Sequence, residues 1–126
     1  MAGAKRFEDL VVWQEARKLV KSIYLITSNG AISRDYGLRD QIQRAAVSAM
    51  TNIAEGFDCE SKAEFARFLS YSRRSAVEVQ SLLYAAQDIG YISSDVFSQH
   101  FAHAEKVKAM SSALKSSLLR ASTARS

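Results

Sequence analysis

Residues 41–56 read QIQRAAVSAMTNIAEG, and this stretch decides the fold. Its apolar residues recur at the three- and four-residue spacing of a helix, and they fill two neighbouring stripes. Little of the circumference stays polar, and a helix of this kind buries more than one side. The pattern continues on both flanks and predicts a helix over residues 37–57 that packs against several others. The two stripes hold Leu38, Ile42, Ala45 and Ala49, and Ala46, Met50, Ile53 and Phe57.

A first helix is predicted over about residues 9–27. Asp9 is a favourable N-cap, and Gly30 follows the last turn, as glycine often does at a helix C-terminus. Apolar residues recur along one face between Leu10 and Tyr24. This spacing indicates a helix with one buried side.

Two more helices are predicted towards the C-terminus. Ser61 and Glu64 stand at the spacing of a capping box, and Gly90 ends the apolar pattern that follows them. A fourth helix is predicted from residues 93–95 to about residue 119. The remaining tail, RASTARS, is expected to fray.

These elements predict the fold class. The 126 residues suit a single domain over residues 1–126, with an ordered core of about residues 7–119. The chain contains no proline, which would break a helix interior. Long helices joined by short loops pack as antiparallel neighbours. The prediction is an all-α, antiparallel up-down-up-down four-helix bundle.

The single cysteine and the hydropathy of the sequence indicate the cellular compartment. Cys59 cannot form an internal disulfide, and its neighbours Asp58 and Glu60 disfavour a reactive thiolate. The N-terminus lacks the apolar core of a signal peptide, and no apolar run approaches the ~20 residues of a membrane span. A cytoplasmic protein without membrane contact is expected.

The chain has 17 Lys and Arg against 13 Asp and Glu, a net charge of +4. Arginines interleaved with an aromatic side chain suit phosphate contact and base stacking. The alternative interpretation is a solvated face that carries an Arg74–Glu78 ion pair. The candidate nucleic-acid-binding residues are Arg67, Tyr71, Arg73 and Arg74 on the third helix and Arg17, Lys18 and Lys21 on the first; Lys106, Lys108, Lys115 and Arg120 form a third basic cluster.

No residue set predicts a cofactor, a metal or catalysis. His100 and His103 stand three apart, but no Glu-x-x-His motif of a carboxylate-bridged bundle site is present. Glu55 has no second carboxylate, nucleophile or base on its face, so we expect it to pair with an arginine and the protein not to be an enzyme. Asn52 is expected to cap or crosslink helices, and Gly56 to end a helix or admit a close backbone.

The motifs carry a family resemblance. They are Phe7-Glu8-Asp9-Leu10, Trp13, Ala16, Leu19, Tyr24, Tyr36-Gly37-Leu38, Gln41-Ile42, Arg44-Ala45-Ala46, Ser48, Asn52-Ile53-Ala54-Glu55-Gly56, Phe65, Phe68-Leu69, Ser75, Glu78 and Gly90-Tyr91-Ile92. This pattern resembles the bacterial four-helix-bundle proteins encoded in intervening sequences of large-subunit rRNA genes. It is also similar to a related branch, the accessory variability protein of diversity-generating retroelements. Arg74-Ser75 replaces the family's usual Gly-Ser, and residues 28–35 lack its common proline.

The resemblance implies a barrel-like homopentamer. In the retroelement branch it implies a ring that binds nucleic acid and partners a reverse transcriptase. Self-association is also expected because the apolar arcs of the first two helices exceed what one core can use. The predicted function is a non-enzymatic oligomeric bundle that binds RNA or DNA through its basic clusters. The alternative is an adaptor for a protein partner such as a reverse transcriptase.

Overall fold

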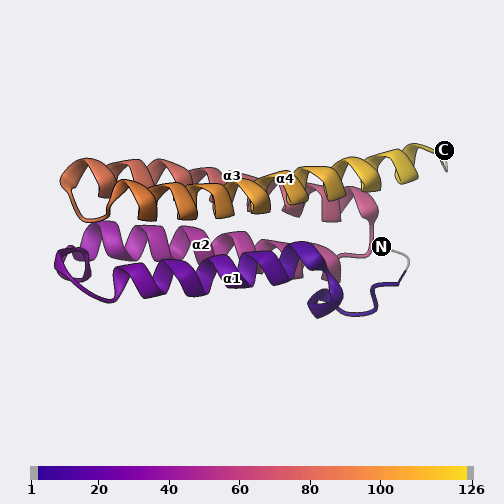
Figure 1. Ribbon diagram of the computed structural model, residues 1–126. Helices are drawn as coiled ribbons and strands as arrows, with labels where there is room; N and C mark the ends of the chain where they lie inside the picture. Colours follow the sequence, from indigo (N-terminus) through magenta and orange to yellow (C-terminus); the bar gives the residue numbers. More distant parts are fainter. Residues whose placement is uncertain (1–2, 125–126) are drawn as a thin grey trace.

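The protein is an antiparallel four-helix bundle, as predicted. The computed structural model describes residues 3–124, with the side chains of residues 3–121. Two short 3-10 turns precede the first and second helices (Figure 1). In chain order the elements are η1 (Phe7–Asp9), α1 (Val11–Thr27), η2 (Ala31–Arg34), α2 (Tyr36–Asp58), α3 (Lys62–Ile89) and α4 (Ser94–Ala124).

The helices form two layers of two. Figure 1 shows α1 beside α2 in one layer and α3 beside α4 in the other. Helix α3 packs extensively against both α2 and α4, whereas α1 and α4 meet more sparsely. The start of α1, the end of α4 and the α2–α3 connection lie at one end of the bundle.

The core runs along the whole bundle axis. Small alanines let the helix backbones approach closely, and larger aliphatic side chains fill the space between those positions. Burial of this apolar surface is the main stabilising contribution. The largest fully buried aliphatic side chains are Leu19, Ile23, Ile42, Ile53, Leu69, Val79, Leu83 and Val107. The buried alanines between them are Ala16, Ala45, Ala46, Ala49, Ala66, Ala76, Ala86 and Ala104.

The predicted start of the first helix was wrong by two residues. Asp9 does not cap α1, because its carboxylate accepts hydrogen bonds from the backbone N–H groups of Lys5 and Arg6, both at 3.2 Å. It therefore closes the short turn η1. Leu10 is extended and buried, and α1 begins at Val11.

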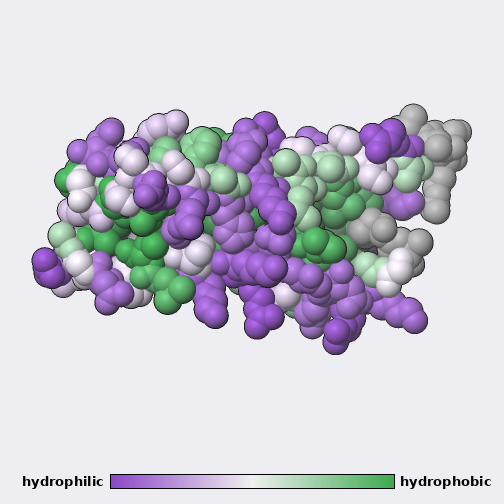
Figure 2. Space-filling model, in the orientation of Figure 1, coloured by the Kyte–Doolittle hydropathy of each residue, from purple (hydrophilic) through white to green (hydrophobic). Residues whose placement is uncertain are grey.

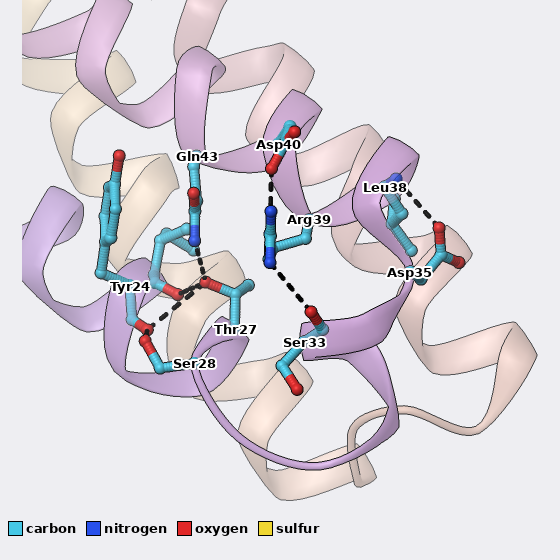
Figure 3. Close-up of polar contacts among 10 residues, drawn as sticks. Tyr24, Thr27, Ser28, Ser33, Asp35, Leu38, Arg39, Asp40 and Gln43 are labelled. Carbon is cyan, nitrogen blue, oxygen red and sulfur yellow. Dashed lines mark hydrogen bonds and ion pairs between the residues drawn. The ribbon is translucent and has the colours of Figure 1, made fainter.

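Polar side chains fasten the corner between α1 and α2 (Figure 3). The Asp35 carboxylate caps α2 by accepting from the backbone N–H of Leu38 at 3.1 Å. The Arg39 guanidinium donates to the backbone carbonyl of Ser33 at 2.9 Å. Gln43 donates to the hydroxyl of Thr27, which is fully buried. These contacts hold residues 28–35 in a defined path without a proline.

Both predicted ends of the third helix are confirmed. The Ser61 hydroxyl accepts from the backbone N–H of Glu64 at 3.1 Å, which caps α3. Gly90 adopts φ +91°, a left-handed conformation that glycine tolerates best. The Tyr91 hydroxyl then donates to Asp35 at 2.9 Å and ties the α3–α4 connection to the start of α2.

The predicted fraying of the C-terminal tail was wrong in part. Helix α4 continues to Ala124, past the expected end at residue 119. Residues 120–124 contain arginine and alanine, which favour helix, and neither glycine nor proline stops the helix there. Arg125 and Ser126 lie outside the described residues.

Candidate nucleic-acid interface

The α1 cluster is exposed, but part of its charge is engaged. Arg17, Lys18 and Lys21 line a shallow open groove of about 370 Å³ together with Gln14. The Arg17 guanidinium lies over the Trp13 ring, 5.6 Å from its centre. The Lys18 ammonium lies 3.5 Å from a carboxylate oxygen of Glu15. The structure brings these cations together, but fewer are available to a ligand than their number suggests.

The four predicted residues of α3 are also exposed. The Arg74 guanidinium lies over the Tyr71 ring at 6.0 Å, and that ring packs edge-on against Phe68 at 5.5 Å. The expected Arg74–Glu78 ion pair is absent from the described side chains, and the Glu78 carboxylate accepts a long hydrogen bond from Gln41 of α2 at 3.4 Å. Arg74 therefore keeps its charge for an outside partner.

Two arginines of this cluster meet α4 in a polar groove. The groove is open, has a volume of about 420 Å³ and contains no carboxylate in its lining. The sequence placed Lys115 in a separate cluster, but the fold brings it beside Arg73 and Arg74. Arg67 does not line the groove. The lining residues are Ser70, Arg73 and Arg74 of α3 and Ser112, Lys115, Ser116 and Leu119 of α4.

The helix register explains why this groove is basic. Ser72 contacts Ser111 at 3.4 Å, and Gln80 donates to Glu105 at 3.0 Å. This antiparallel register sets residues 65–77 beside residues 106–118. The first stretch has three arginines and the second has three lysines, and neither contains Asp or Glu. The acid-free stretch of α3 thus lies beside the acid-free stretch of α4. The absence of Asp and Glu from both stretches is visible in the sequence alone.

The other lysines of α4 are used within the bundle. Lys106 lies 3.3 Å from Glu15, and Lys108 lies 3.7 Å from Glu105. A hydrogen bond from Gln80 lowers the pKa of Glu105, and Lys108 lowers it further against an opposing effect of burial. These pairs leave Lys115 as the α4 lysine that serves the groove.

An ionic cluster joins α1 to α4. The half-buried Glu15 carboxylate contacts Lys18, Lys106 and the Nε2 atom of His103, the last at 3.4 Å. Burial acts to raise the pKa of Glu15, but the two lysines outweigh it and the pKa lies below its ordinary value. In Figure 2 a hydrophilic band crosses the middle of the face formed by α1 and α4, between two apolar patches.

The two histidines have separate surroundings. His100 donates from Nδ1 to the backbone carbonyl of Val96 at 2.8 Å, whereas His103 faces Glu15. Among the residues that the structure describes, no group of three or more His, Cys, Asp or Glu could hold a metal ion. Nor is any helix within that part of the chain long and apolar enough to cross a membrane.

Asn52 acts within α2 and not at a helix end. Its side-chain amide donates to the carbonyl and the hydroxyl of Ser48, at 2.9 and 3.0 Å. Ser48 in turn shares a hydrogen bond with Ser75 of α3 at 2.9 Å. Asn52 thus supports the crosslink through Ser48 and does not form it directly.

Gly56 lies at a close approach of α2 to α3. A Cβ atom at this position would lie 2.7 Å from the Cβ of Phe68 and 2.9 Å from the ring of Phe65. Glu55 and Arg44 are exposed, and neither forms an ion pair among the described side chains. The expected pairing of Glu55 with an arginine is not found among the described side chains, where Glu55 is exposed.

Cys59 follows the end of α2. Burial raises the pKa of its thiol, and the carboxylates of Glu64 and Asp58 raise it further, against a smaller opposing effect of Arg67. A thiol with a raised pKa is a weak nucleophile at neutral pH.

Comparison with known proteins gives the family. The sequence profile described as 23S rRNA-intervening sequence protein matches residues 8–113. A crystal structure at 1.70 Å resolution of a protein of unknown function from the S23 ribosomal protein family of Bacteroides thetaiotaomicron VPI-5482 has a similar fold, with a TM-score of 0.77. That protein is 19% identical, and the match covers 83% of this chain and 98% of that chain. No curated protein matches the sequence significantly. Since the profile covers most of its length, the chain belongs to the family of 23S rRNA-intervening sequence proteins.

Proposed function

We propose that this protein is a non-enzymatic, oligomeric nucleic-acid-binding bundle that contacts RNA or DNA mainly through phosphates. The observation that carries the proposal is the acid-free surface shared by α3 and α4. Arg73, Arg74 and Lys115 converge there, and no carboxylate lies in the lining of the groove between the two helices. Guanidinium and ammonium groups in such a setting bind phosphate oxygens.

The mode of binding follows from the side chains available. The groove offers cations and hydroxyls, the groups that often contact phosphate oxygens. Binding would therefore depend on charge neutralisation and little on sequence. One chain with a net charge of +4 is a weak electrostatic partner. A ring of several chains would repeat the basic surface and raise the local positive potential.

The test is binding to mixed-sequence RNA and DNA at increasing salt. The double variant Arg73→Glu/Arg74→Glu should weaken binding to all sequences about equally. It should also make binding less dependent on salt, because fewer phosphates are neutralised and fewer counterions are released when the variant binds. Both side chains are exposed, so the fold should be retained. The control is Lys5→Glu/Arg34→Glu, which makes the same charge change at exposed positions outside the clusters.

Two outcomes would contradict the proposal. One is equal loss of binding in the control pair, which would indicate a net-charge effect without a specific surface. The other is no binding by the unaltered protein at ~50 mM salt with protein in the tens of micromolar, where phosphate contacts are strongest.

The second candidate is an adaptor for a protein such as a reverse transcriptase. It is favoured by an aromatic cluster on the outer side of α3 and α4. Tyr84 is 52% exposed although its ring packs on Phe97 and Phe101, at 4.8 and 5.7 Å. Tyrosines of this kind are frequent in protein interfaces. The test is co-purification with a reverse transcriptase encoded nearby, with Tyr84→Ser expected to abolish the complex.

A further inference from the structure

We propose that the groove between α3 and α4 is a discrete site for one backbone phosphate of a single-stranded nucleic acid, with Tyr71 beside it as a stacking platform for a base. This inference rests on the proposed function and deepens it. A diffuse basic surface would need only cations, whereas this groove also supplies hydroxyl donors and an adjacent aromatic ring.

The hydroxyls are the first argument. Ser112 and Ser116 line the groove beside Lys115, and neither side chain makes a hydrogen bond within the described part of the chain. Ser70 completes the polar lining, although its hydroxyl has a long contact of 3.4 Å to the carbonyl of Ala66. Hydroxyl groups donate to phosphate oxygens and add geometric definition to a charged site.

The electrostatic surroundings are the second argument. The carboxylate nearest to the groove along α4 belongs to Glu105, ten residues or roughly 15 Å from Lys115 along the helix axis. That carboxylate is held by Gln80 and Lys108, and Arg73 also lies close enough to lower its pKa. Arg74 forms no ion pair with Glu78, whose carboxylate accepts from Gln41 in the described part of the chain. An anion in the groove would thus meet three cations, and the lining itself contains no carboxylate.

Tyr71 is the third argument, and it favours a single strand. Its ring lies beside Arg74, which also lines the groove, and Phe68 supports its edge. The tyrosine is 36% exposed, so one part of the ring is open to a ligand. A base stacks on such a ring only when it is free of its own neighbours in a duplex.

The experiment measures affinity for a mixed-sequence single-stranded 20-mer and for its duplex by fluorescence anisotropy at constant salt. The variant Ser112→Ala/Ser116→Ala removes the hydroxyls and keeps every charge. It should weaken single-strand binding by about fivefold or more, since hydrogen bonds to charged groups contribute measurably. Its salt dependence should stay unchanged, because the number of neutralised phosphates is the same.

Two further variants test the cation and the ring. Lys115→Gln should weaken binding severalfold and lower the salt dependence, whereas Arg34→Gln at the far end of the bundle should do neither. Tyr71→Ala should weaken binding to the single strand by at least about fivefold, and Tyr71→Phe should restore it because the ring is retained. Circular dichroism melting checks that each variant is folded.

The outcomes separate this inference from the proposed function. If the serine, Lys115 and Tyr71 variants bind like Arg34→Gln while the unaltered protein still binds nucleic acid, the discrete site is wrong and the general proposal stands. Tighter binding to the duplex than to the single strand would also overturn the discrete site. If the unaltered protein binds neither, both ideas fail.

Discussion

At the scale of single residues, Gly56 shows the tightest constraint. The Gly56→Ala variant should be less stable by about 1–3 kcal/mol, because its Cβ would meet the Cβ of Phe68 at 2.7 Å and the helices must separate. Chemical denaturation at constant temperature measures the difference in the free energy of unfolding.

The matched control is Gly37→Ala in the first turn of the same helix. A Cβ there would have only a distant contact, 3.9 Å from Asp35. Alanine should leave stability unchanged or raise it by about 0.4–1 kcal/mol, because it restricts the unfolded chain. Equal effects at the two glycines would show that the close approach at Gly56 has no energetic weight.

The Ser48 crosslink gives a second prediction. Asn52→Ala removes two donations to Ser48 but leaves the Ser48–Ser75 bond, so it should cost roughly 0.5–1.5 kcal/mol. Combining Ser48→Ala with Asn52→Ala should cost less than the two single changes added together, because both remove the same contact. Urea unfolding of the four proteins forms the double-mutant cycle; strict additivity would contradict the network.

At the scale of helices, the contact between α1 and α4 depends on Glu15. Its folded-state pKa is depressed, so the stabilisation is present above the unfolded pKa and is lost as pH falls through the folded pKa. The free energy of unfolding should therefore drop below about pH 4.5, the ordinary value for this carboxyl. Glu15→Gln should reduce that drop.

Urea unfolding at several pH values between about 6 and 3 measures this effect, over the range in which carboxyls protonate. Glu55→Gln is the control, because Glu55 is exposed and has no ion pair among the described side chains. A pH profile for Glu15→Gln that matches the unaltered protein would show that the cluster contributes nothing to folding.

Helix ends also belong to this scale. Ser61 and Gly90 act through their own backbone neighbourhood, so the sequence predicted both ends of α3. Asp9 could cap either of two adjacent turns, and it caps the earlier one because Leu10 must be extended to enter the core. Local patterns cannot make that choice, since burial of Leu10 depends on helices distant in sequence.

At the scale of the whole molecule, self-association remains a prediction. We expect a homo-oligomer, with a pentamer favoured by the family resemblance, and light scattering at micromolar concentration should give a multiple of 13.9 kDa. Val11, Leu25, Tyr36, Tyr84 and Ile89 are more than half exposed and could form the interface. A monomer mass would contradict the expectation.

The structure changes the argument for association. The apolar stripes of α2 are buried or partly buried, and the helices that pack extensively on α2 are α1 and α3. Tyr36, at the start of α2, is a large hydrophobic residue that stays exposed. The apolar surface left for a partner belongs instead to α1 and to the outer side of α3. Variants that test association should therefore change exposed residues such as Leu25, Tyr84 or Tyr36 and not the buried stripes of α2.

The sequence by itself determined the helices, their antiparallel order and the buried face of each, because helical periodicity and capping act over short separations. It also supplied the residues of each basic cluster. Only the tertiary structure decided which charges are engaged. Glu15 pairs with Lys18 and Lys106, whereas Arg74 lies over the Tyr71 ring and forms no ion pair among the described side chains. The register of α3 against α4 then joins Lys115 to Arg73 and Arg74. The Glu15–Lys106 pair and the groove join residues of different helices. The sequence could not predict them, because packing of the apolar core sets the register between the helices.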